Sequence, residues 1–273
     1  MPEGPEVQII CDYLNVNLLG QSLIDHKIID KHWWSKSKRL REMKMAKFEG
    51  VERKAKYIIW HWDYWHWVSH LAMTGGWVIR RNPTAVMRYT RARFSFSGGV
   101  ELDFIDTRRW GKLEIYDDEE WEKEKERFVF GPDGMGELNA DQIQHQIESR
   151  VRNTRGNIDI KPVLMEQNFI AGIGNIYASE ILHICNISPF RDIRNLSEEE
   201  IEALAFAIPE VLNRAYENGG SSIKDFVHPD GSVGSAQLGH FVYGQTQCRF
   251  CNGSITKVTQ KSRTTYWCQQ CQK

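Results

Sequence analysis

Residues 248–271 read CRFCNGSITKVTQKSRTTYWCQQC and contain two Cys-x2-Cys pairs, Cys248 with Cys251 and Cys268 with Cys271, separated by sixteen residues. This spacing lets four thiolates converge on one tetrahedral zinc ion. Disulfide bonds are the alternative, and the paired spacing favours zinc over them. Because four thiolates leave no open position for water, we expect one structural Zn²⁺ that builds a platform and takes no part in catalysis.

The segment from Cys248 to Cys271 is basic. It carries Arg249, Lys257, Lys261 and Arg263 and no acidic residue. A ribbon cross-linked by zinc would therefore present only positive charge, and phosphate is the expected counterpart.

Length and composition limit the class of protein. A chain of 273 residues with 41% hydrophobic residues is long enough for two or three domains, which excludes a single small module. No apolar run approaches the roughly 20 residues that span a bilayer, and the N-terminus lacks a signal-peptide pattern. We therefore expect a soluble, intracellular protein without a membrane partner, in the cytoplasm and nucleoid or, in a eukaryote, in the nucleus.

The net charge of −1 conceals a strong segregation of charge along the chain. From Lys31 to Lys56 there are ten basic residues against three acidic ones, and the last 33 residues have five basic residues and no acidic one. Asp117 to Arg127 carries seven acidic and three basic residues, which is typical of a solvated helix face. The basic segments remain suited to nucleic acid because the charges cancel only in the total.

The order of patterns along the chain predicts a mixed α and β protein with several domains. A helical stretch around Val7 to Leu19 is followed by β-like runs at residues 57–60, 77–79 and 93–96. The breaker cluster Phe130 to Gly134 marks a domain boundary. Helical spacing then runs to about Asn218, with Pro209 among the residues expected to break or start helices. A polar loop reaches Gly239 before the cysteine segment.

The first residues have a chemical possibility beyond a capped helix start. Removal of Met1 would leave Pro2 with a secondary amine, whose pKa lies near that of α-amino groups, about 8. Such an amine is nucleophilic in its neutral form and adds to an aldehyde-level carbon to give an iminium. Glu3 and Glu6 stand beside it as candidates for proton transfer.

A second motif, Ala171 to Ala178, places two glycines before a predicted helix. Such a turn exposes backbone N–H groups at a positive helix terminus, which suits a phosphate. A tight packing turn explains the same pattern equally well.

Taken together, the motifs resemble the formamidopyrimidine-DNA glycosylase and endonuclease VIII family of base-excision-repair enzymes over nearly the whole chain. The matching segments are Pro2–Glu6, Lys56-Tyr57 with His70–Met73, Asp106–Gly111, Gly172–Glu180, Gly219–Phe226, and Val242–Gly244 before the four cysteines.

The resemblance implies three domains and a DNA-binding enzyme. They are an N-terminal β-sandwich with an N-terminal helix (residues 1–130), a helix-two-turn-helix domain with a lesion-capping loop (131–239), and a β-ribbon zinc finger (240–273). It further implies a monomer that binds damaged DNA, and a bifunctional DNA glycosylase and abasic-site lyase that removes oxidised bases through a Pro2 imine followed by β,δ-elimination.

The resemblance also assigns roles to individual residues. Pro2 would be the nucleophile, Glu3 would protonate the opening sugar ring and Glu6 would assist the proton relay. The family's DNA phosphate contacts match Lys56, His70, Asn175, Tyr243 and Arg263. Lys56 also belongs, with Pro2, Glu3 and Glu6, to the catalytic residues that the resemblance implies. The positions that fill the void left by a flipped base match Met73, Arg108 and Trp110, and a thioether, a planar cation and an indole are suitable stacking groups.

The branch of the family stays open. Gly4 resembles the endonuclease VIII side, which prefers oxidised pyrimidines. Met73 and the loop from Asp225 to Gly239 resemble the formamidopyrimidine side, which prefers oxidised purines. Trp110 stands where that side has phenylalanine, which leaves the opposite-base preference undecided.

Two alternatives belong to other functional classes. A non-catalytic protein could keep the helical domain and the finger for binding damaged DNA, and a redox or zinc-storage protein would use the four thiols. Formation of a covalent imine by Pro2 distinguishes the enzyme from the first alternative.

Overall fold

The structure is a computed structural model that describes residues 1–81, 86–136, 138–222 and 228–273. The chain forms two compact units. The first contains Met1–Pro2, Glu6–Val129 and Gly219–Ser235, and the second contains Glu3–Pro5, Phe130–Asn218 and Ala236–Lys273. The N-terminal hexapeptide is therefore shared between the two units.

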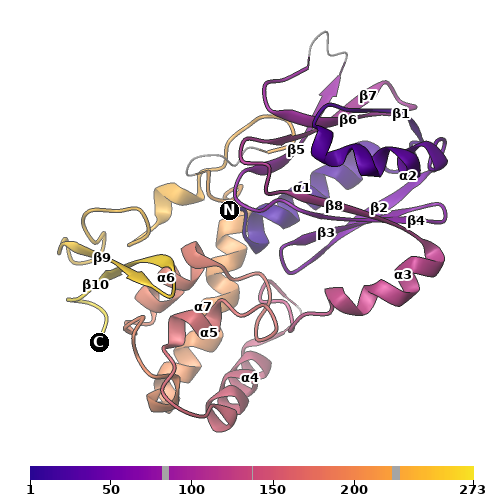
Figure 1. Ribbon diagram of the computed structural model, residues 1–273. Coiled ribbons are helices and arrows are strands. Elements are labelled where there is room, and N and C mark those ends of the chain that lie inside the picture. The colour runs from indigo at the N-terminus through magenta and orange to yellow at the C-terminus, as the bar shows by residue number, and fades with distance from the viewer. Residues whose placement is uncertain (82–85, 137, 223–227) are drawn as a thin grey trace. The chain divides into compact units, whose positions relative to one another are not determined.

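Two four-stranded antiparallel sheets make up the first unit (Figure 1). One has the order β1-β6-β7-β5 and the other the order β2-β3-β4-β8. The strands are β1 (Leu23–Ile28), β2 (Phe48–Lys54), β3 (Tyr57–Trp62), β4 (Trp65–His70), β5 (Gly75–Arg81), β6 (Thr90–Phe96), β7 (Val100–Asp106) and β8 (Lys112–Asp117). The predicted β-runs lie in β3, β5 and β6, and these predictions are confirmed.

Tryptophans fill the space between these sheets. Trp60, Trp62 and Trp67 from one sheet and Trp77 from the other are buried in one core, and the rings of Trp60 and Trp77 are 4.9 Å apart. Along β6 buried and partly buried residues alternate, as expected for a strand with one face on the core. The β-sandwich expected from the sequence is therefore confirmed.

Short helices flank the sandwich. They are α1 (Gly4–Leu18), η1 (Lys31–Lys36), α2 (Ser37–Glu42), α3 (Asp118–Glu124) and η2 (Lys125–Phe128). Helix α1 begins before Val7 because Pro5 is tolerated in a first turn, where the backbone N–H has no partner within the helix. Helix α3 buries no residue and starts with a capping box between Asp117 and Glu120, which confirms the solvated acidic helix.

The second unit is helical and ends in a β-hairpin. Its elements are α4 (Ala140–Asn153), α5 (Ile160–Leu164), α6 (Asn175–Ile184), η3 (Ile193–Asn195), α7 (Glu198–Glu217), η4 (Ala236–Gly239), β9 (Ile255–Gln260) and β10 (Arg263–Cys268). Figure 1 shows the hairpin, in yellow, beside α6, and β10 contacts that helix. The predicted helical region and ribbon are confirmed, so the mixed α and β fold class holds.

The prediction for Pro209 is wrong. Pro209 lies inside α7 and does not end it. Proline removes the hydrogen bond to the carbonyl of Ala205, but buried neighbours such as Ile208 and Leu212 keep both halves of the helix on the core. Among the described residues, no helix combines the length and the apolar character needed to cross a membrane.

Candidate active site and metal centre

The carboxylate of Glu3 is held at the N-terminus of α6. It accepts hydrogen bonds from the backbone N–H groups of Ile176, at 2.9 Å, and Tyr177, at 3.3 Å, and Glu3 is only 2% exposed. A Cβ at Gly174 would collide with this carboxylate, so glycine is required for the close approach. The glycine turn exposes backbone N–H groups as expected, but a carboxylate of the same chain accepts their hydrogen bonds, so phosphate binding at this turn stays a prediction.

Asn175, the first residue of α6, connects the helix to the hairpin. Its side-chain oxygen accepts from Nζ of Lys161 at 2.6 Å, and its Nδ2 donates to the carbonyl of Thr264 at 2.8 Å. Nζ of Lys161 also donates to Oγ1 of Thr265. Burial lowers the pKa of Lys161 to about 8, with Glu3 opposing the shift and Arg263 adding to it. Asn175 thus fixes the strand that begins with Arg263.

Tyr243 lies in a short segment that a buried acid holds in place. The Glu180 carboxylate of α6 accepts from the backbone N–H groups of Phe241, Val242 and Tyr243, at 2.7, 3.1 and 2.7 Å. Burial raises the pKa of Glu180, while these three donors oppose that shift. Burial also raises the pKa of Tyr243, so its hydroxyl stays protonated at neutral pH and can donate a hydrogen bond.

Arg263 is exposed and directly follows the hairpin turn, at the start of β10. The two residues of that turn, Lys261 and Ser262, have φ values of 44° and 64°. Positive φ at both positions is the geometry of a type I′ turn, which matches the twist of the two strands. The hairpin therefore holds Arg263 at a defined place at the start of β10.

Glu6 is held by a hydrogen bond to another residue of the first unit. Its Oε1 accepts from the N–H of Ser221 at 2.7 Å, and the residue is 1% exposed. Gly220 has a φ of 72° and lies so close to Glu6 that a Cβ would stand about 2.9 Å from its side chain. Pro2, which belongs to the same unit, is buried, and Met1 precedes it in the structure.

Lys56 and His70 lie at one end of the β3-β4-β8 sheet, where His70 pairs with Tyr57 on β3 and with Lys112 on β8. Burial, together with the charges of Lys56 and Lys112, lowers the pKa of His70 to about 4. His70 is therefore neutral at pH 7. Its Nδ1 accepts from the N–H of Ala72 at 3.2 Å, so the proton lies on Nε2.

The loop after β7 presents Arg108 and Trp110. Trp110 is 56% exposed, and the Arg108 guanidinium lies 5.3 Å from the centre of its ring. The Asp106 carboxylate organises the loop by accepting from the N–H groups of Arg108, at 3.1 Å, and Gly111, at 2.7 Å, and from the hydroxyl of Thr74. The structure thus brings two of the three predicted void-filling side chains together.

Met73 directly precedes Thr74 and is partly buried. Beside the loop, the buried Asp30 carboxylate pairs with Nε of Arg109 at 2.8 Å and with Arg91 at 3.4 Å. This ion pair ties Arg109 to Asp30.

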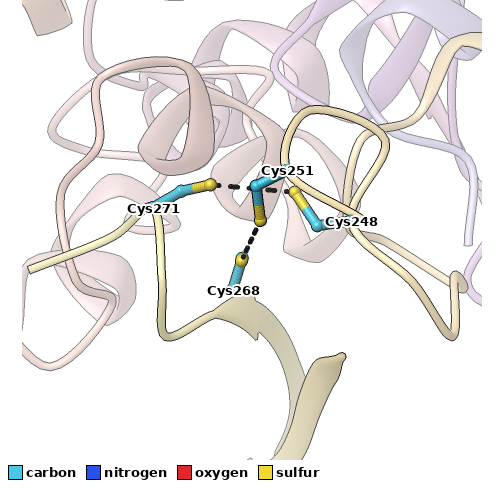
Figure 2. A group of neighbouring side chains, drawn as sticks. All are labelled: Cys248, Cys251, Cys268 and Cys271. Carbon is cyan, nitrogen blue, oxygen red and sulfur yellow. Dashed lines mark hydrogen bonds between the residues drawn. The ribbon is translucent and has the colours of Figure 1, made fainter. Parts of the chain in front are cut away.

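The four cysteines meet at one point (Figure 2). Their sulfur atoms lie within 4.8 Å of one another, with Cys251 and Cys268 at 3.4 Å and Cys248 and Cys271 at 3.8 Å. Four thiolates about 2.3 Å from a central zinc stand roughly 3.8 Å apart, whereas a disulfide joins sulfurs at about 2.05 Å. The cluster is thus suited to one metal ion, and none of its cysteines is joined in a disulfide.

The predicted lesion-capping loop is only partly described. Its start at Asp225 lies outside the described residues, as do Ile223, Lys224 and Phe226 of the matched motif. Residues 228–235 belong to the first unit, where the carbonyl of Pro229 accepts from the N–H of Ile79, on β5, at 2.7 Å. A role over a flipped base stays a prediction.

Sequence reasoning missed the residues that hold the site in place. These are Lys161, Glu180, Asp106, Asp30 and His183. Nε2 of His183, on α6, lies 3.2 Å from Sγ of Cys248. The sequence contains only a weak indication of these residues. Asp106 and Glu180 lie inside matched motifs, but the functional roles were assigned to other residues of those motifs.

Comparison with known proteins shows the family. The model of the formamidopyrimidine-DNA glycosylase N-terminal domain matches residues 1–113, and that of the H2TH domain matches residues 131–227. A formamidopyrimidine-DNA glycosylase of Wolbachia sp. subsp. Brugia malayi is 34% identical over 100% of both chains. One of Oceanobacillus iheyensis is 30% identical over 100% of this chain and 98% of its own.

Solved structures agree. The structure of the Lactococcus lactis FPG protein with abasic-site DNA matches this chain with a TM-score of 0.88 and a sequence identity of 27%. The match covers 99% of each of the two chains. The same protein with DNA containing an oxidised pyrimidine also reaches 0.88 at 27% identity, over 100% of both chains. The chain therefore belongs to the formamidopyrimidine-DNA glycosylase and endonuclease VIII family and is a DNA glycosylase of base excision repair.

Proposed function

We propose that the protein is a bifunctional DNA glycosylase and abasic-site lyase that excises oxidised bases through an imine on Pro2. The observation that carries this proposal is the buried Glu3 carboxylate on the first turn of α6. These hydrogen bonds hold the carboxyl group of the residue next to Pro2 in one place, which supports its proposed role in proton transfer. Removal of Met1 completes the site by converting the Pro2 nitrogen from an amide into an amine.

The reaction proceeds in balanced steps. The Pro2 nitrogen attacks C1′ of the damaged nucleotide, the base leaves with the electron pair of the glycosidic bond, and Glu3 protonates the sugar ring oxygen as the ring opens. The nitrogen gives up its proton, through Glu6, to the departing base, and it forms an iminium with C1′ as the bond between C1′ and the ring oxygen breaks. This electron sink makes the C2′ proton acidic, so β-elimination and then δ-elimination release the two phosphates. Glu6, which the Ser221 N–H fixes, assists proton transfer.

We assign DNA phosphate contacts to Lys56, His70, Asn175, Tyr243 and Arg263. These five residues have different surroundings, so they would bind phosphate in different ways. Lys56 and Arg263 supply charge. His70 and Tyr243 donate as neutral groups, because the pKa of His70 is about 4 and that of Tyr243 is raised. Asn175 acts in part through the hairpin, since it binds Lys161 and the Thr264 carbonyl.

We propose that the cysteine cluster holds one structural Zn²⁺ through Cys248, Cys251, Cys268 and Cys271. The sulfur distances and the four-thiolate donor set support this metal. When bound, the ion cross-links the ribbon that presents Arg263. Four protein ligands close the coordination sphere, so the role is structural.

The substrate class is decided by cleavage of duplexes that each carry one lesion. The panel contains a formamidopyrimidine, 8-oxoguanine, an oxidised pyrimidine and an abasic site, each opposite every normal base. We expect excision of at least one oxidised base and strand products that end in phosphate on both sides of the gap, as β,δ-elimination requires. Products of β-elimination alone, or cleavage of the abasic site only, would contradict the proposal.

Trp110→Ala is expected to weaken binding to lesion-containing duplex by about 1–3 kcal/mol, because stacking on one base has this magnitude. Trp110→Phe should retain most of the affinity, since it keeps an aromatic face. Tyr64→Ala is the matched control, because Tyr64 is 78% exposed in the same unit and lies outside the matched motifs. Titration of labelled duplex measures all three. An equal loss for Trp110→Ala and Tyr64→Ala would rule out the void-filling role.

Arg263→Ala is expected to weaken binding to all DNA sequences about equally and to lower the slope of log K against log salt by about 1, because one phosphate contact is lost. Removal of the metal should lower it further, since the ribbon then loses its cross-link. Titrations at several salt concentrations measure the slope, with the exposed Arg155→Ala as control. An unchanged slope, or a loss confined to one lesion, would show that Arg263 does not contact phosphate.

A further inference from the structure

Helix α6 makes contacts outside the helix near its start, its middle and its end. The N–H of Ile176 binds Glu3, Glu180 binds the backbone of residues 241–243, and His183 reaches the cysteine cluster. The side chains of Glu180 and His183 are spaced i and i+3, so they lie on the same face of the helix. The helix that holds the catalytic acid at its first turn therefore ends on the metal centre.

His183 is fixed tightly at that end. It is 4% exposed, and its ring stacks on Phe241 with the ring centres 5.3 Å apart and the planes 19° apart. Its Nε2 is 3.2 Å from Sγ of Cys248, within hydrogen-bond distance of a sulfur. Its Nδ1 is buried and has no hydrogen-bond partner in the part of the chain that the structure describes.

These contacts decide which nitrogen carries the proton. A metal-bound thiolate has no proton and can only accept a hydrogen bond. If the proton were on Nδ1, a buried N–H would lack an acceptor and the lone pair of Nε2 would face the lone pairs of the sulfur. With the proton on Nε2, the imidazole donates to Cys248 and leaves only an unprotonated nitrogen unpaired. The surroundings thus favour the Nε2 proton.

We propose that His183 is a positioning residue of the metal centre, which donates an Nε2–H···Sγ hydrogen bond to the Cys248 thiolate and fastens the cluster to the last turn of α6. The inference rests on the proposed zinc site. A thiolate that accepts such a bond carries less negative charge, so it is less easily protonated or alkylated and releases its metal more slowly. The Cys-x2-Cys spacing contains no sign of this residue, because His183 precedes Cys248 by 65 positions.

Two variants separate the hydrogen bond from packing. His183→Phe keeps a planar ring against Phe241 but has no donor, and His183→Gln keeps an N–H donor. Relative to wild type, we expect zinc release to a colorimetric chelator to be about tenfold faster in His183→Phe and intermediate in His183→Gln. The exposed His145→Phe, in the same unit, should release zinc at the wild-type rate.

Cobalt substitution gives a readout that does not depend on activity. Loss of the hydrogen bond makes the Cys248 sulfur a stronger electron donor, so the thiolate-to-cobalt charge-transfer band of His183→Phe should move to longer wavelength. His183→Gln should move it less. A purely structural role of the ring would leave the band in place.

A measurement on the unmodified protein covers the case in which His183→Phe fails to fold. In wild type loaded with NMR-active cadmium and isotope-labelled histidine, we expect a slowly exchanging His183 Nε2 proton that couples to the metal through the hydrogen bond. A proton on Nδ1, or no coupling, would overturn the inference. Metal analysis distinguishes a wrong metal site from a wrong role of His183. Wild-type protein with less than one zinc per chain would refute the proposed metal site. One zinc per chain, with a rate of zinc release and spectra that do not change in His183→Phe, would refute only the role of His183.

Discussion

Protein that retains Met1 is expected to bind DNA with an abasic site but to lose both base excision and strand cleavage, by about a thousandfold or more. In this form the Pro2 nitrogen belongs to a peptide bond, so it has no lone pair for attack on C1′. The DNA contacts proposed for Lys56 and Arg263 do not involve this nitrogen. Single-turnover assays and binding titrations on the same duplex measure the two effects, with mass spectrometry establishing the N-terminus.

Pro2→Gly and Pro2→Ala supply graded controls. Each leaves a primary amine after removal of Met1, which forms an imine but lacks the ring that fixes the nitrogen. We therefore expect both variants to retain a fraction of the chemistry and nearly full binding. Equal strand cleavage by wild type and by protein shown to keep Met1 would exclude Pro2 as the nucleophile.

Glu3→Gln is expected to slow base excision by about 10²–10⁴-fold, the usual contribution of a positioned proton donor. The amide oxygen can still accept from the N–H group of Ile176, and only the longer bond from Tyr177 to the second oxygen, at 3.3 Å, is lost, so the N-terminal segment should stay in place. The rate of strand cleavage at a preformed abasic site should fall less, because the sugar ring of an abasic site opens without a proton donor from the enzyme.

The test of Glu3→Gln uses two substrates and one matched control variant. Rates are measured on a duplex with an oxidised base and on one with an abasic site. Glu166→Gln is the control, because Glu166 lies in the same unit and forms a part-exposed ion pair with Arg150. An equal loss on both substrates would place the role of Glu3 in binding or folding, and proton donation would then be wrong.

The sequence predicted the elements whose signal is local. Period-2 patterns located β3, β5 and β6, spacing of four located α4 through Ile143 and Ile147, and the cysteine spacing located the metal cluster. The prediction failed at Pro209, because tertiary packing of the buried face outweighed the local preference of proline.

The chemistry of the residues suggested roles for Pro2, Glu3 and Arg263, and the resemblance to a family made these roles specific, but they stay predictions. The residues that position them were beyond local reasoning. Glu180 acts on a segment 61 residues away, and Lys161 acts on Thr265 over 104 residues. No spacing rule connects such pairs, so only the fold reveals them. The neutral state of His70 could not be predicted from the sequence either. It results from burial and from the charges of Lys56 and Lys112, which lie in other parts of the chain.

The central claim is that the Pro2 amine forms a covalent imine with damaged DNA. Its most direct test is borohydride reduction of wild-type protein on an oligonucleotide with one abasic site, followed by digestion and mass spectrometry of the cross-linked peptide. We predict one adduct per chain, carried by the peptide that begins at Pro2, with the sugar fragment on its terminal nitrogen. An adduct on a lysine such as Lys56, or no adduct under conditions in which the strand is cut, would contradict the account.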